Sequence, residues 1–163
     1  MIAMRLYDFV LWIHVAAVVI AFGAPFIYPV ILARVTNANP EALPGIYNAM
    51  VHAGRTLITV AYLVLFLAGA YLASDAGLWS EHWVSGSLVI LIVLIGLSHG
   101  LALPTEKKLS AIATTELAAR GAGGGPMTFS AEYEKAYRKL NLVGLISNVL
   151  VLIALYLMIV QPA

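Results

Sequence analysis

Four histidines lie in or beside long apolar stretches of the chain: His14, His52, His82 and His99. A polar side chain inside a membrane is costly, so a histidine within a membrane span is a candidate for function. Imidazole is also the commonest metal ligand in proteins and a frequent axial ligand of haem iron. These residues therefore make a metal or haem site within a membrane the first hypothesis.

Four apolar runs carry these histidines and predict an all-α fold, a polytopic four-transmembrane-helix bundle. The spans are expected at about residues 7–34, 46–74, 82–104 and 138–160. Each run approaches or exceeds the roughly 20 residues that a helix needs to cross about 30 Å of hydrocarbon. Backbone amides find no water in lipid, so such segments must be helical.

Composition indicates a single membrane domain over residues 1–163. Hydrophobic residues make up 62% of the chain and charged residues 10%, against roughly 25% charged in a typical soluble domain. The net charge of +1 gives no footprint for nucleic-acid binding. Because the chain has no cysteine, thiol redox chemistry and thiolate metal sites are excluded.

Prolines and glycines predict where the helices bend and end. Pro25 and Pro29 lie within the first run and are expected to kink it. The second helix is expected to begin near Gly45 and the third to end at Pro104. A glycine-rich stretch predicts a flexible cytoplasmic linker at 119–129. Ser130 follows it as the expected N-cap of the last helix.

Basic residues concentrate in two of the three connections between the spans. Among the 9 lysines and arginines, all but Arg5 flank or occupy the first and third connections. The connection around Asp75 and Glu81 has none. The positive-inside rule therefore places the first and third connections in the cytoplasm and both termini outside.

This topology orders the histidines by depth. At about 1.5 Å per residue, His14 lies roughly 10 Å from the outer surface and His99 within roughly 10 Å of the inner surface. The two are therefore too far apart to share one metal ion or haem iron. His52 and His99 lie at similar depths. Arg55 follows His52 by one turn and Arg34 is nearby. This set predicts a site for a haem and its propionates, or for an anionic headgroup.

Structural roles are the alternative for each of these side chains. His52 and Arg55 can snorkel to the membrane interface, and His82 lies at the outer interface. His14 and His99 are surrounded by apolar residues, which makes them the stronger candidates for metal ligands. Hydrogen bonds between helices, worth about 0.6–2 kcal/mol, would instead make them packing residues without chemistry. No pair of carboxylates lies within the spans, which argues against a proton-driven transporter.

Several stretches resemble a known family. They are Leu11-Trp-Ile-His14, the run from Gly69 through Trp83 to Leu109, and the ending from Ala154 to Pro162. Together they resemble a bacterial family of predicted integral membrane proteins of unknown function, domain of unknown function 2269. The resemblance covers nearly the whole chain and implies a multi-pass protein of the bacterial cytoplasmic (inner) membrane.

A wider similarity is to the haem-dependent membrane protoporphyrinogen oxidases and to copper-resistance D proteins. It rests on His14, on Tyr28-Pro29 followed by Arg34, and on Ser98-His99-Gly100. That resemblance implies haem b as a cofactor, contacted by His14 and His99, in conflict with the depth order above. The lysine that the oxidases carry beside their core histidines has no counterpart in the third span.

Three functions follow from these observations. The first is a haem-binding or redox-associated membrane module, indicated by the histidines. The second is a non-catalytic scaffold or partner subunit of a membrane complex, and a homodimer fits this class because four helices enclose little interior. The third is a metal-ion permease. No motif names a reaction, so whether the chain is an enzyme stays open.

Overall fold

The computed structural model describes residues 6–120 and 127–162, and within these ranges it contains helices and no strand. Four of the described helices are long and apolar enough to cross a membrane. Their bounds are Leu6–Ala38, Pro40–Asp75, His82–Arg120 and Ala131–Val160. The prediction of an all-α fold with four membrane helices is therefore confirmed.

The second and third of these helices are each interrupted by a π-helical turn. The elements are α1 (Leu6–Ala38), η1 (Pro40–Ala42), α2 (Leu43–Ala53), the π turn η2 (Gly54–Ile58), α3 (Thr59–Asp75), η3 (Leu78–Ser80), α4 (His82–Leu97), the π turn η4 (Ser98–Ala102), α5 (Leu103–Arg120) and α6 (Ala131–Val160).

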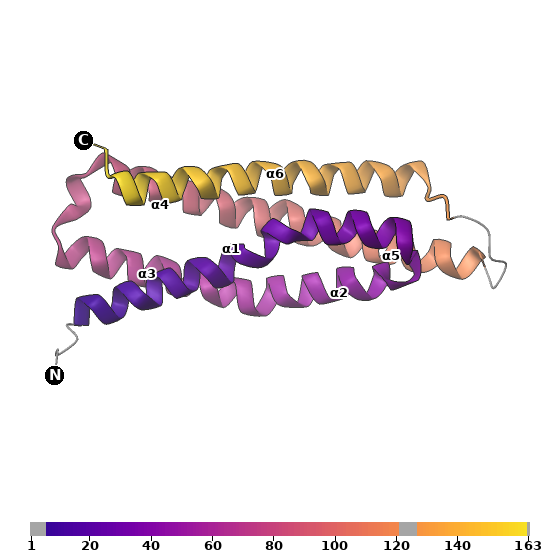
Figure 1. The fold of residues 1–163 in the computed structure, drawn as a ribbon, viewed down its shortest axis with the longest axis horizontal. Coiled ribbons are helices and arrows are strands. Elements are labelled where there is room, and N and C mark those ends of the chain that lie inside the picture. The colour runs from indigo at the N-terminus through magenta and orange to yellow at the C-terminus, as the bar shows by residue number, and fades with distance from the viewer. Residues whose placement is uncertain (1–5, 121–126, 163) are drawn as a thin grey trace.

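The four helices run up and down, so both described chain ends lie at the same end of the bundle (Figure 1). We call this the termini end and the opposite one the basic end, because the lysines and arginines beyond Arg5 lie toward it. Packing pairs α1 with α3, α2 with α5, and α4 with α6. By contrast, α3 and α4 touch only sparsely and diverge toward the termini end (Figure 1).

One predicted helix boundary is wrong. The third helix does not end at Pro104 but continues to Arg120. Pro104 is the second residue of α5, where the missing N–H of proline is tolerated, and the preceding π turn already departs from the regular hydrogen-bond ladder. The second helix, expected to begin near Gly45, has α2 beginning at Leu43 after the 3-10 turn η1, which confirms that prediction. At Pro104 the helix continues beyond the point where the apolar run stops.

Other local predictions are confirmed. Pro25 and Pro29 lie inside α1, whose axis changes direction along its length (Figure 1). The backbone N–H of Tyr133 donates to the Ser130 hydroxyl at 3.2 Å, so Ser130 is the N-cap of α6. Of the linker predicted at 119–129, the first two residues belong to α5, and residues 121–126 lie outside the described part of the chain.

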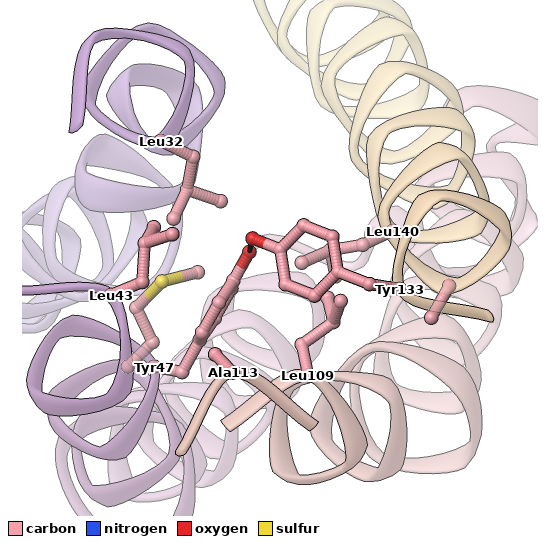
Figure 2. Packing of buried hydrophobic residues seen from close by; sticks show 9 residues of the cluster. Leu32, Leu43, Tyr47, Leu109, Ala113, Tyr133 and Leu140 are labelled. Atoms are coloured by element: carbon pink, nitrogen blue, oxygen red, sulfur yellow. Dashed lines mark hydrogen bonds between the residues drawn. The ribbon is translucent and has the colours of Figure 1, made fainter. Parts of the chain in front are cut away.

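The tightest packing lies at the basic end. The second and third helices have 36 and 39 residues, so at about 1.5 Å per residue they exceed the roughly 30 Å of hydrocarbon. The parts of these helices that extend beyond the hydrocarbon layer are stabilised by a separate hydrophobic core. Leu43, Tyr47, Leu109 and Tyr133 have no exposed surface there, and the two tyrosine hydroxyls meet at 2.9 Å (Figure 2). We call this cluster the basic-end core.

The tyrosine pair generates a stability prediction. Tyr47→Phe leaves the buried hydroxyl of Tyr133 without this partner, which costs about 1–3 kcal/mol for an unsatisfied buried group. We expect a lower unfolding midpoint in detergent for Tyr47→Phe and for Tyr133→Phe. The double variant should lose less than the sum of the two. Strictly additive losses would show that the hydroxyls do not interact.

Candidate functional site

The π turns η2 and η4 come together where the second and third helices pack. A Cβ atom added at Gly54 would lie 2.6 Å from Leu103 Cδ2, so the glycine permits this close approach. Single π turns within helices are rare and occur frequently at functional sites. The junction of the two turns is therefore the first candidate for a site.

One hydroxyl joins the two turns. Thr59 Oγ1 donates to the Gly54 carbonyl at 2.7 Å and lies 2.9 Å from His99 Nε2. Since the single hydroxyl proton goes to Gly54, we assign the hydrogen of the second contact to His99 Nε2, which donates to Thr59. The other ring nitrogen, Nδ1, lies 3.2 Å from the Ile95 carbonyl. That oxygen can only accept, so a neutral ring that donates from Nε2 turns the lone pair of Nδ1 toward it, and Nε2 alone makes a hydrogen bond.

An open groove of about 420 Å³ lies beside this junction, and we call it the basic groove. Its wall consists of Arg55, Thr59, His99, Leu103, Pro104 and Lys107. The ion pair found in the described residues joins Lys108 to Glu132 at 2.7 Å and leaves Arg55 and Lys107 out. Two cationic side chains thus face one groove without a carboxylate partner in the described chain.

The structure brings together part of the predicted site. Arg55 and His99 line the basic groove, as their similar depths predicted. His52 and Arg34 are exposed and do not line its wall. A role for these two in cofactor binding stays a prediction.

His14 lies in a different place. Its side chain is 7% exposed and packs against Gly69 of α3, where an added Cβ would lie 3.1 Å from the imidazole Cε1. It lines a second space, an apolar cavity at the termini end. The two predicted metal ligands, His14 and His99, therefore line separate pockets. Within residues 6–120 and 127–162, no group of three His, Cys, Asp or Glu side chains is placed to hold a metal ion.

Sequence reasoning missed Thr59 and Lys107. Lys107 follows His99 by eight residues, or about two helical turns, which places both on one helix face. That signal was hidden because the helix was expected to end at Pro104. Thr59 could not be singled out from the sequence, because threonine is common in membrane helices. Its hydrogen bond to the Gly54 carbonyl becomes evident only when the π turn is known.

Glu106 is a further residue that the sequence did not single out. It is 7% exposed and lines an inner cavity of about 90 Å³, together with Tyr28, Tyr62, Ser98 and Asn141 among others. Most of its lining is apolar, and it is far smaller than the roughly 300–1,000 Å³ of small-molecule pockets. It is therefore too small for a cofactor.

The fold and the site define a multi-pass integral membrane protein with an open basic groove. A model of the family DUF2269, described as a predicted integral membrane protein, matches residues 8–162, and the chain belongs to this family. No curated protein and no solved structure matches the chain. The wider similarity to protoporphyrinogen oxidases and copper-resistance D proteins therefore stays a hypothesis.

The Thr59 bridge generates a testable prediction. Thr59→Val keeps the shape of the side chain but removes the hydroxyl, so the Gly54 carbonyl and His99 Nε2 lose this partner. We expect a loss of about 0.6–2 kcal/mol, the range for hydrogen bonds between membrane helices, seen as a lower unfolding midpoint. Thr59→Ser keeps the hydroxyl and should stay near the wild type. Equal midpoints for the two variants would contradict the bridging role.

Proposed function

We propose that this protein is a ligand-binding membrane module whose basic groove holds the anionic end of an amphiphile. The observation that carries the proposal is the convergence of two cations, Arg55 and Lys107, on one groove without a carboxylate partner in the described residues. An anionic ligand supplies the missing countercharge. The proposal is a binding function and assigns no reaction.

The position of the groove supports this proposal. Arg55 precedes Asp75 by 20 residues, which is roughly 30 Å of helix and matches the thickness of the hydrocarbon layer. Arg55 therefore lies at one interface when Asp75 lies at the other. Leu57 and Leu101, in the same two π turns, are exposed. An amphiphile can place its headgroup in the groove and its apolar part along these leucines.

The anion can belong to an anionic phospholipid or to the propionates of haem b. Phospholipid is the better fit, because Nε2 of His99 already has Thr59 as its partner and Nδ1 lies against its own helix at the Ile95 carbonyl. The observation that favours haem is an imidazole beside two cations, which suits one axial ligand and two propionates. Haem would require His99 to exchange Thr59 for iron, and it would supply redox chemistry to the module.

A partner role for the chain is compatible with this binding function. Gly96 and Gly100 are exposed on α4 and η4, and an added Cβ at either would meet nothing within 4 Å. Small residues spaced by four allow close approach of a second helix, from another copy or from a subunit of a membrane complex. The structure offers less for a metal-ion permease, since no metal-ligating cluster forms in the described residues.

We further propose that the protein lies in the bacterial inner membrane with its basic end in the cytoplasm. The asymmetry of lysine and arginine between the connections supports this orientation. Alkaline phosphatase fused after Ala163 should then be active, and green fluorescent protein fused at the same point should be dark. A fluorescent fusion with inactive phosphatase would reverse the orientation.

Lipid titration tests the groove. Phosphatidylglycerol added to the protein in neutral detergent should raise the unfolding midpoint more than phosphatidylcholine, because a ligand that binds the folded state stabilises it by mass action. Arg55→Gln and Lys107→Gln should each weaken the apparent affinity about fivefold, which corresponds to roughly 1 kcal/mol per interfacial charge. Lys135→Gln is the matched control, an exposed lysine at the same end outside the groove.

The control separates groove binding from general charge attraction. An equal loss in Lys135→Gln would show that phosphatidylglycerol binds the whole basic end and not the groove. Haem addition is the parallel arm: a Soret band that His99→Ala abolishes would assign the groove to haem. The absence of both a lipid-specific shift and a Soret band would contradict the proposal.

A further inference from the structure

A second ligand site is indicated by the cavity at the termini end, which we call the outer cavity. It measures about 220 Å³ and is lined by residues of α1, α3, α4 and α6. It exists because α3 and α4 diverge there and touch only sparsely (Figure 1). Tyr7, Trp83 and Gln161 belong to its wall and lie near the ends of their helices, so they form its outer rim.

Two buried polar atoms in the wall of this cavity have no hydrogen-bond partner in the described chain. They are His14 Nδ1 and Ser87 Oγ. The side chains are 7% and 4% exposed, respectively. Leaving a buried polar group unpaired costs about 1–3 kcal/mol by protein mutational data. A ligand with a hydrogen-bonding group would remove this cost at both residues.

The unpaired nitrogen of His14 can be matched by a hydroxyl. Nδ1 carries either a hydrogen or a lone pair, depending on the tautomer of the ring, and it has no partner in the described chain. A hydroxyl group can both donate and accept, so it pairs with Nδ1 in either tautomer.

Size and polarity narrow the ligand class. An apolar cavity of about 150 Å³ binds benzene, so the outer cavity has room for one substituted ring. The deeper wall is apolar and includes Val18, Phe22, Leu65, Leu88, Leu91 and Val151. Ordered waters need about two to four polar partners each, and two orphan atoms cannot support enough waters to fill this volume.

We propose that the outer cavity binds a single phenolic ring. Its hydroxyl pairs with His14 Nδ1, its ring contacts the apolar wall, and Ser87 Oγ provides a second hydrogen-bonding point. The same chemistry occurs in free phenols and in the reduced rings of lipid-soluble quinols. This site is independent of the basic groove, with which it shares no lining residue.

The test uses two probes that differ by one hydroxyl, 4-fluorophenol and fluorobenzene. Fluorine NMR of the full chain in detergent, with empty micelles subtracted, gives both affinities. The wild type should prefer 4-fluorophenol about tenfold, the worth of one hydrogen bond. His14→Phe should abolish the preference, and Ser87→Ala should reduce it.

Ser85→Ala is the matched control, because Ser85 lies two residues away on α4, is exposed, and donates to its own helix at the His82 carbonyl. It should bind both probes like the wild type. If His14→Phe fails to fold, the Ser87→Ala and Ser85→Ala pair still decides the matter. Equal wild-type affinities for the probes, or a preference unchanged by Ser87→Ala, would overturn the proposal. Displacement of 4-fluorophenol by a short-chain ubiquinol would identify quinols as the source, and no displacement would identify free phenols.

Discussion

A buried backbone carbonyl needs a hydrogen-bond partner, and this constraint governs the junction of the second and third helices at the buried Gly54. The π turn η2 departs from the regular ladder, and the Thr59 hydroxyl takes up the Gly54 carbonyl at 2.7 Å. The same oxygen holds His99 of η4 at 2.9 Å. One hydroxyl therefore sets η2 against η4, and this fixes Arg55 and Lys107 around a common groove. The basic groove therefore results from the hydrogen bonds of Thr59 where the two π turns meet.

The two ends of the bundle are packed in different ways, and each candidate site depends on its surroundings. At the basic end, α2 packs against α5 around the buried hydroxyl pair of Tyr47 and Tyr133 (Figure 2). The basic groove lies next to this tightly packed core, which suits a binding site supported by buried side chains. At the termini end, the sparse contact between α3 and α4 leaves the outer cavity. Its buried polar atoms and apolar wall suit a ring with a single hydrogen-bonding group.

The membrane helices and their local signals could be predicted from the sequence, because length and apolarity determine them. The Ser130 N-cap and the bend of α1 could also be predicted, because serine is favoured at N-caps and proline bends helices. The ends of the helices could not be predicted in this way. An apolar run ends where the lipid ends, whereas the second and third helices continue into water around a core of tyrosines and leucines. That error hid the shared face of His99 and Lys107. Depth placed His52, His99, Arg55 and Arg34 at one level, but it could not fix the rotation of each helix. Of these residues the structure brings only His99 and Arg55 to the groove wall.

The central claim is that the basic groove retains an anionic amphiphile from the membrane in which the protein resides. Native mass spectrometry of the protein, extracted from its own membrane with the surrounding lipid, tests this claim most directly. The account predicts one tightly held adduct per chain, with the mass of a phosphate- or carboxylate-bearing amphiphile, that is lost from the Arg55→Gln/Lys107→Gln double variant. A chain without an adduct, or the same adduct on the double variant, would contradict it.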